Sequence, residues 1–362
     1  MDDNYVVNDA GCYIPKFIEG FGYTIPYRSK HREIGVVKEK ADKKIKYVKT
    51  ENKILTDVRE AIQKCNLKDG MTISFHHHLR DGDYIINIVM KEIAELGIRN
   101  ITIVPSSLQK IHEPLIEHIK NGVVSGIHTS GMRGALAKEI SYNNILKKPV
   151  IFQSHGGRAR SIELGETKID VAFVGASACD KMGNMSGRTG KSAFGSMGYA
   201  IVDAKNADKV VAITDNLVEY PLMNPSIDQT FVDYVVVVDE IGDVDKIATG
   251  ATRVTQNPKE LLMAQYAASV INNSGFMRDG FSFQAGSGGA SLAVIRFLKE
   301  YMKQSGIKGG AISGGITSIL VELLEEGYFN ALLDAQTFDA KAANSLNRNK
   351  NHTEMSASMY AN

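Results

Sequence analysis

The feature that most constrains the fold is a series of short apolar, β-rich runs that alternate with helical stretches. Several runs are continuously apolar, which is typical of strands buried on both faces of a parallel sheet. Helical stretches at 84–95 and 115–120 lie between the early runs, and this alternation predicts a mostly parallel α/β sheet. The predicted strands are Met71–Phe75, Ile101–Pro105, Val123–Ile127, Val150–Gln153, Val171–Gly175, Ala200–Asp203, Val210–Thr214 and Val235–Val238.

The pattern divides the chain into three parts. Residues 1–50 are predicted as an irregular leader, lysine-rich over Lys38–Lys49, which serves as a solvated arm or as a docking strip for an acidic partner. A first α/β domain is predicted over 51–250 and a second over 251–362. The second is expected to be incomplete at its C-terminus, because no closing element follows its predicted elements: helix Pro258–Ile271, strand Gly280–Gln284, helix Ala290–Met302, strand Gly310–Ser313 and helix Ile316–Glu326.

Composition excludes several classes of protein. The 362 residues carry 42 Lys+Arg and 41 Asp+Glu, a formal charge of +1, so the chain has no electrostatic footprint for nucleic acid or an anionic membrane. The first residues are acidic and lack an apolar core, and no window reaches the length of a membrane span. Three well-separated cysteines form neither a disulfide framework nor a zinc ribbon. We therefore expect a cytoplasmic protein in a reducing setting.

A glycine-rich turn at 283–290 is the sharpest local signal. It joins a predicted strand to a helix, and glycines there let backbone N–H groups converge on a negative atom. The negative atom would be an oxygen of a phosphate or the developing oxyanion of a thioester. The alternative is that the segment is a plain tight turn without a ligand. It fits neither a Walker loop nor the dinucleotide fingerprint. The candidate catalytic residues are Gly286, Ser287, Gly288 and Gly289.

Polar residues also follow the predicted strands, starting with Phe75–Asp83 and its three consecutive histidines. Because the carboxyl ends of parallel strands line the ligand crevice, we expect these residues near one site. Adjacent residues of an extended segment point to alternate sides, so anion binding is favoured over a metal site; a structural hydrogen-bonded cluster is the other alternative.

Three further strand ends pair glycine with arginine, whose planar fork matches carboxylates. Taken singly, each arginine could equally serve a surface salt bridge, but together they suit a small polycarboxylate. No metal ligand is assigned. The candidate substrate-binding residues are His76, His77, Arg80, Ser130, Arg133, Arg158, Arg160, Asn184 and Arg188.

Several segments resemble the coenzyme A transferases. Leu67–Ile73, Gly97–Val104 and Asp170–Phe173 with Asp180–Asn184 are similar to the first half of such an enzyme, and Phe283–Gly289 to the glycine loop that opens the second half. More narrowly, the chain from about residue 11 onward resembles the citrate lyase alpha chains, whose sequences are longer. The segments that carry this narrower resemblance are Ser74–Asp83, Ser130–Gly134, Ser154–Arg160 and Gly286–Ser291.

The resemblance implies two CoA-transferase-like domains and an acyl exchange. Citrate would replace acetate on the thioester of an acyl-carrier (gamma) subunit, and a citryl-lyase (beta) subunit would cleave the product. The carrier would present a phosphoribosyl-dephospho-CoA group, while the chain itself holds no tight cofactor and belongs to an oligomer. The glycine loop would stabilise the oxyanion, and the histidines and arginines would position citrate.

The resemblance also bears on the mechanism. Ordinary CoA transferases attack with a glutamate, but the corresponding stretch Ala311–Ile316 has Gly314 at that position, which implies direct attack by citrate. A conventional CoA transferase or acyl-CoA hydrolase stays open as an alternative. His352–Met355 resembles a catalytic segment of such enzymes, although it begins 64 positions after Gly288, too far for that alignment. A non-catalytic metabolite-binding regulator is the alternative from another class.

Overall fold

The computed structural model describes residues 4–9, 11–26, 52–247 and 253–361. The lysine-rich segment Lys38–Lys49 and the predicted boundary near residue 250 lie outside the described residues. In the described part of the chain, no helix combines the length and apolar character that crossing a membrane requires.

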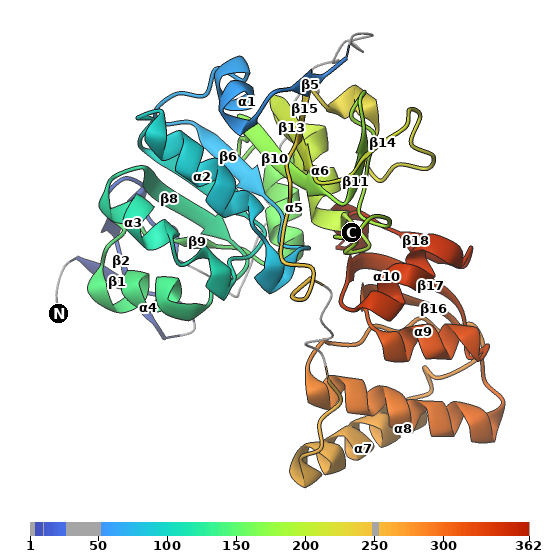
Figure 1. Ribbon diagram of the computed structural model, residues 1–362. Helices are drawn as coiled ribbons and strands as arrows, with labels where there is room; N and C mark the ends of the chain where they lie inside the picture. The colour runs from blue at the N-terminus through green and yellow to red at the C-terminus, as the bar shows by residue number, and fades with distance from the viewer. Residues whose placement is uncertain (1–3, 10, 27–51, 248–252, 362) are drawn as a thin grey trace.

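The larger unit is built on an eight-stranded sheet in which every neighbouring pair is parallel. Its strand order is β5-β15-β13-β10-β6-β7-β8-β9 (Figure 1). β10 is apolar and buried along its whole length, and β13 has the apolar run Val210–Ile213, as expected where helices cover both faces. The strands are β5 (Ile54–Leu55), β6 (Thr72–Phe75), β7 (Ile101–Pro105), β8 (Val124–Thr129), β9 (Ile151–Phe152), β10 (Val171–Ala176), β13 (Lys209–Thr214) and β15 (Tyr234–Val237).

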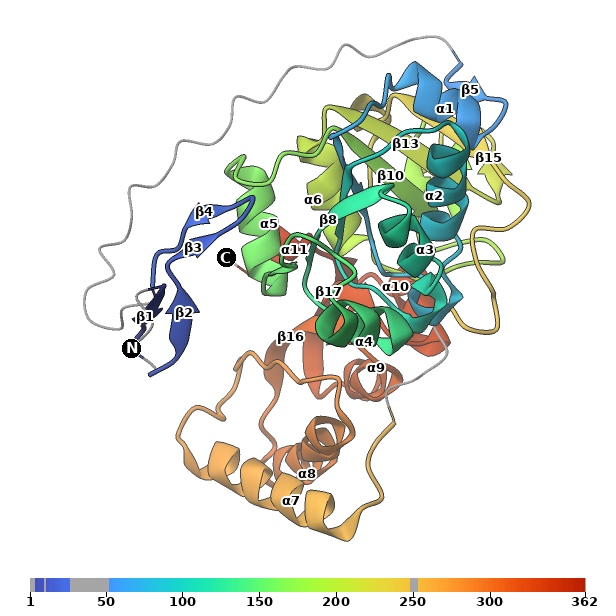
Figure 2. The same ribbon diagram turned by 90° about the vertical axis from the view of Figure 1, so that its left-hand side faces the viewer.

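Helices cover both faces of this sheet, and Figure 2 shows it between α1–α3 on one side and α5 and α6 on the other. On α2, buried side chains recur at the three- and four-residue spacing of one helical face, from Ile85 and Ile86 through Val89 to Ile93. The six helices are α1 (Val58–Lys64), α2 (Ile85–Glu95), α3 (Leu115–Lys120), α4 (Gly134–Asn143), α5 (His155–Glu163) and α6 (Gly198–Asn206).

The order of the strands places a topological switch point between β6 and β10. From β6 the chain runs outward through β7 and β8 to β9, then returns to β10 on the other side of β6. Crossovers leave the two central strands in opposite directions, so the carboxyl ends of β6 and β10 form the usual ligand position of an open α/β sheet.

The smaller unit is a three-stranded parallel sheet, β16-β17-β18, with its own buried apolar cluster. Its last helix, α11, packs on α5 and α6, and Ala357 of α11 belongs to the core of the larger unit. The elements are α7 (Pro258–Asn273), α8 (Gly289–Ser305), β16 (Gly309–Ile316), α9 (Ser318–Glu325), β17 (Phe329–Thr337), α10 (Ala340–Arg348), β18 (His352–Glu354) and α11 (Ala357–Tyr360).

Short elements complete the chain. Two antiparallel hairpins lie near the N-terminus, and a small sheet in the order β12-β11-β14 is formed by segments that follow β10 and β13 in the chain. They are β1 (Tyr5–Val7), β2 (Tyr13–Pro15), β3 (Phe17–Ile18), β4 (Gly22–Tyr23), β11 (Ala178–Asp180), β12 (Met185–Ser186) and β14 (Leu217–Val218), with 3-10 turns at Arg80–Gly82, Lys110–His112 and Gln229–Phe231.

The parallel α/β prediction is confirmed, with four corrections. Ala200–Asp203 lies in α6, and not in a strand, because this helix is buried from Gly198 to Ala204 and the apolar run has no alternating polar positions that would mark one exposed helix face. Gly280–Gln284 contributes only a single bridge, Phe283 to Ile312. The prediction missed β17, α10, β18 and α11, so elements do follow α9. The leader holds the hairpins β1–β4 where irregular structure was expected.

Candidate active site

Three buried histidines follow β6 at the switch point. The Nε2 of His76 lies 2.9 Å from the Gly175 carbonyl oxygen, so this nitrogen carries the proton and Nδ1 is an acceptor. The backbone N–H and Nδ1 of His78 lie 3.4 and 3.0 Å from that acceptor. The Nδ1 of His77 lies 2.5 Å from the Ser106 hydroxyl, which also accepts the His77 backbone N–H. Fixed rings at this position can orient a ligand.

Burial determines the charge of these histidines. Desolvation holds the pKa of His77 and of His78 well below the ordinary value of 6.5, and the neighbouring imidazoles and Arg80 lower both further. The pKa of His76 is also lowered by burial. At neutral pH the rings are therefore uncharged, so they can donate and accept hydrogen bonds but add no positive charge for an anion.

Aromatic rings enclose the histidines. His77 stacks on His155 with centroids 5.7 Å apart, and the Tyr199 ring lies 5.0 Å from each of them. On the other side, Phe194 lies 5.7 Å from the His76 ring. Burial raises the pKa of Tyr199, so its phenol is a proton donor at neutral pH. We call His76–His78, His155, Phe194 and Tyr199 the histidine cluster.

Two arginines supply positive charge beside this cluster. The Arg80 guanidinium lies 4.6 Å from the centre of the Phe338 ring, and burial and the neighbouring charge of Arg133 lower its pKa. Within the described part of the chain, neither Arg80 nor Arg133 has an ion-pair partner. Close to them, the buried Ser130 hydroxyl has no hydrogen-bond partner, and the Ser130 N–H donates to the Ser106 carbonyl, next to His77. These groups suit an incoming anion with several oxygens.

The structure thus brings together four predicted substrate residues: His77, Arg80, Ser130 and Arg133. His76 lies behind them, against Gly175 and Phe194. Their binding role stays a prediction.

Arg158 and Arg160 do not have the predicted environment. Arg158 is 1% exposed, and its fork pairs with both Asp203 oxygens at 2.8 Å and with the Val104 carbonyl at 2.7 Å. The Arg158 side chain thus points from α5 into the core and is fully occupied by these partners, so its role in substrate binding stays a prediction. Arg160 is exposed and pairs with Glu166 on the surface.

Asn184 and Arg188 are likewise engaged within the protein. The Asn184 amide donates to Asp180 at 2.7 Å and accepts the Gln229 N–H at 2.9 Å. Arg188 pairs with Glu354 at 2.9 Å. Both side chains are therefore engaged within the protein, and their role in substrate binding stays a prediction.

The glycine loop lies on the smaller unit. Gly288 is the N-cap of α8 with φ −75°, and a Cβ there would meet no atom of the described residues within 4 Å. The loop is exposed at Gly286, Ser287 and Gly288, while Gly289 is half-buried. Just before it, the Gln284 amide donates to the Tyr360 hydroxyl, and Tyr360 lies close enough to Tyr199 to raise its pKa. The loop is therefore connected through α11 to the histidine cluster, and its catalytic role stays a prediction.

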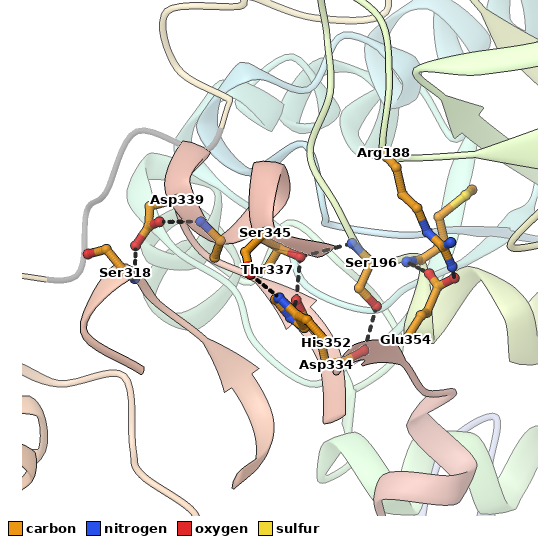
Figure 3. A network of polar contacts seen from close by, with 11 residues as sticks. Arg188, Ser196, Ser318, Asp334, Thr337, Asp339, Ser345, His352 and Glu354 are labelled. Atoms are coloured by element: carbon orange, nitrogen blue, oxygen red, sulfur yellow. Dashed lines mark hydrogen bonds and ion pairs between the residues drawn. The ribbon is translucent and has the colours of Figure 1, made fainter. Parts of the chain in front are cut away.

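A buried polar network joins the two units (Figure 3). At its edge Glu354 accepts hydrogen bonds from Arg188 and from the Met197 backbone N–H. In the sheet register, Glu354 on β18 is paired with Asp334 on β17, and Asp334 is paired with Gly314 on β16, where a β-bulge begins and φ is +111°. The Glu354 carboxylate therefore lies in register with Gly314, two strands away, although the spacing along the chain had argued against aligning Glu354 with the catalytic glutamate.

Comparison with known proteins gives the family. The family model for "Citrate lyase, alpha subunit" matches residues 51–362. This chain belongs to the citrate lyase alpha subunit family. It is 54% identical over 312 residues to a citrate lyase alpha chain of Haemophilus influenzae, with 86% of this chain and 62% of the relative covered.

A similar crystal structure supports the same family. It is described as the alpha subunit of citrate lyase in complex with citrate from Streptococcus mutans, and shares 55% identity and a TM-score of 0.86 over 89% of this chain and 63% of that one. The chain therefore spans about three fifths of the length of the citrate lyase relatives it matches.

The fold extends to more distant proteins. A 4-hydroxybutyrate CoA-transferase of Porphyromonas gingivalis has 18% identity and a TM-score of 0.54 over 83% of this chain and 67% of its own. This likeness confirms the CoA-transferase-like α/β fold.

Sequence reasoning missed two members of the histidine cluster, His155 and Tyr199, and two residues beside it, Glu354 and Tyr360. His155 lies on α5 and Tyr199 on α6, whereas Glu354 and Tyr360 lie on β18 and α11 near the end of the described chain. Only His155 had a local signal, as the first residue of a helix that follows a strand end. Among the described residues, no group of three His, Cys, Asp or Glu side chains is arranged to hold a metal ion.

Proposed function

We propose that this chain binds citrate and takes part in its exchange for acetate on an acyl-carrier thioester. The observation that carries the proposal is that two arginines, Arg80 and Arg133, have no ion-pair partner among the described residues. They lie beside His77 and the Ser130 hydroxyl, which has no hydrogen-bond partner in that part of the chain either. Citrate has three carboxylates and one hydroxyl, which match two guanidinium forks and neutral hydrogen-bonding groups. The relative from Streptococcus mutans is described as a complex with citrate.

The proposed reaction begins with attack by a citrate carboxylate oxygen on the acetyl thioester carbon. The C–S bond breaks, the carrier thiolate leaves, and a citryl–acetyl anhydride forms. The thiolate then attacks the citryl carbonyl carbon, and acetate leaves. Positioning of the two reactants would supply on the order of 7–11 kcal/mol of the barrier. Backbone N–H groups of the loop Gly286–Gly289 would stabilise the oxyanion, where one donor is worth about 2.7–4 kcal/mol.

The partners follow from the same proposal. The thioester would be carried by a phosphoribosyl-dephospho-CoA group on the acyl-carrier (gamma) subunit, with a citryl-lyase (beta) subunit as consumer of the product. We place this complex in the cytoplasm, as an oligomer without tight cofactor of its own. Beside Gly288, at the start of α8, the described residues leave space that suits the approach of a thioester.

A conventional CoA transferase with Glu354 as nucleophile is the second candidate. Its side chain is at the junction of the units, yet both carboxylate oxygens already accept hydrogen bonds, from Arg188 and from the Met197 N–H. An occupied carboxylate is a poor nucleophile, so direct attack by citrate is favoured.

Isothermal calorimetry with citrate tests the binding part of the proposal. Arg133→Lys should weaken citrate binding about tenfold, because a point charge replaces a bidentate fork. Arg160→Lys, the same change at a surface ion pair on α5, is the matched control and should bind like the unaltered protein. Equal affinities for the two variants would remove Arg133 from the site.

Acyl exchange with acetyl-carrier tests the chemistry. Gly288→Val should fold normally, because φ is −75° and the space beside Cα is open, but should lose turnover by blocking the thioester. Full turnover in that variant would refute the oxyanion assignment. Hydroxylamine trapping should find no acyl group on Glu354, whereas a modified Glu354 would establish the conventional mechanism.

A further inference from the structure

The last strand of the smaller unit reaches into the larger one through Glu354. Its side chain is 6% exposed, and one carboxylate oxygen lies 2.9 Å from the Arg188 Nη2 (Figure 3). The other oxygen accepts the backbone N–H of Met197, the N-cap residue of α6. A single carboxylate therefore ties together the two ends of one segment of the larger unit, which we call the 187–198 segment.

The same segment lies directly against β17. The Ser196 N–H donates to the Thr337 hydroxyl at 2.9 Å, and the Ser196 hydroxyl donates to the Asp334 carbonyl at 2.8 Å. A Cβ on Gly195 would lie 2.1 Å from the Thr337 Oγ1, and one on Gly198 2.3 Å from a β17 carbonyl oxygen. Backbones packed this closely leave the segment little freedom to move as long as β17 and β18 stay in place.

A buried relay holds those two strands. The His352 Nδ1 is hydrogen-bonded to the Ser345 hydroxyl at 3.0 Å, and its Nε2 to an Asp334 carboxylate oxygen at 3.3 Å. The Thr337 hydroxyl, which accepts from Ser196, donates to the same Asp334 oxygen at 2.6 Å. His352 precedes Glu354 by two residues and lies on the same side of β18. The relay therefore fixes the strand from which Glu354 projects.

The 187–198 segment also positions two rings of the histidine cluster. Phe194, within the segment, lies 5.9 Å from the His78 ring, and Tyr199, the residue directly after the segment, lies 5.0 Å from the His77 ring. A shift of the segment would move both rings relative to His77, which β6 and Ser106 hold separately. The geometry of the cluster thus depends on the contact between the units.

We propose that Glu354 is a positioning residue for substrate binding. Its carboxylate holds the 187–198 segment so that Phe194 and Tyr199 complete the histidine cluster, and it does not itself touch the substrate. The identity of the ligand as citrate rests on the proposed function, whereas the effect on the segment does not.

Glu354→Gln tests the role because the amide keeps the size and one acceptor but removes the charge opposite Arg188. Glu326→Gln is the matched control, since it makes the same change at the exposed ion pair with Lys299 on the same unit. Amide hydrogen exchange and citrate calorimetry are measured on both. E354Q should exchange faster within the 187–198 segment and bind citrate about tenfold more weakly, while E326Q matches the unaltered protein.

A substitution of the partner residue, Arg188, controls for a folding defect in the Glu354 variant. Arg188→Gln, at a side chain that is 23% exposed, should reproduce the effects of E354Q, and the double variant should add little. Faster exchange throughout the smaller unit, equal behaviour of E354Q and E326Q, or an acyl adduct on Glu354 would each overturn the positioning role. If the unaltered protein binds no citrate, the proposed function fails, and the exchange comparison still decides the role of Glu354.

Discussion

Replacing Arg158 with alanine should lower the free energy of unfolding and leave citrate binding largely unchanged. Its guanidinium makes two hydrogen bonds to Asp203 and one to the Val104 carbonyl, and both charged residues are 1% exposed. Arg158→Ala removes the only cation that the structure shows paired with Asp203 among the described residues, and leaves a buried carboxylate without compensation. The pair links α5 to α6, so its loss loosens one whole face of the main sheet.

The magnitude follows from that burial. Removing one partner of a buried ion pair costs about 3–5 kcal/mol, because the remaining charge stays desolvated. For a unit of this size the cost corresponds to a fall of about 10 °C in Tm. Arg158→Met combined with Asp203→Leu should recover most of the loss, since replacing both partners by apolar groups is often neutral.

Urea unfolding followed by circular dichroism measures the effect, with citrate calorimetry on the same samples. Arg160→Ala is the control on the same helix, and its exposed pair with Glu166 should contribute about 0–1 kcal/mol. The reasoning is refuted if Arg158→Ala unfolds like the control but loses citrate binding, because Arg158 would then serve the ligand and not the core.

Three further outcomes are expected. The free energy of unfolding should fall as pH drops below 6.5, the pKa of an unfolded histidine, because burial lowers the pKa of His77 and its neighbours and only the unfolded chain binds those protons. In urea titrations between pH 7.5 and 5.5, His77→Gln should reduce this dependence of the unfolding free energy on pH. Cys12 is exposed while Cys65 and Cys179 are buried, so a disulfide reagent should titrate one thiol per folded chain and the rest only after denaturation; rapid labelling of all three would contradict the packing. Asn184→Ala should lower the free energy of unfolding by about 1–3 kcal/mol, because Asp180 loses a buried hydrogen bond, and should leave citrate affinity unchanged. Weaker citrate binding without loss of stability would instead indicate that Asn184 contacts the substrate.

The sequence predicts the main sheet well because its strands are continuous apolar runs. Parallel pairing then places the residues that follow each strand at one edge, which is why His77, Arg80, Ser130 and Arg133 come together. The same rule fails for Arg158. This residue lies one turn inside α5, where the helix directs its side chain toward Asp203, and a pairing 45 positions away has no local signature.

Two other failures have equally definite causes. Because α6 is buried over Gly198–Ala204, the run Ala200–Asp203 has no helical periodicity of polar residues and reads like a buried strand. Glu354 is far from the glycine loop in sequence, and only the crossovers through α9 and α10 bring β18 into line with β16. Spacing along the chain is a poor guide wherever such crossovers intervene.

The docking of α11 on α5 and α6 has a consequence for synthesis on the ribosome. Ala357 completes a core whose other members all lie at or before Ile247, about 110 residues earlier. At about 5–20 residues per second, the nascent larger unit would wait on the order of ten seconds with the surface beneath α11 still exposed. Contacts over such separations also slow folding, because loop closure must precede any gain from burial. During that interval the uncovered faces of α5 and α6 are open to chaperones or to a neighbouring nascent copy.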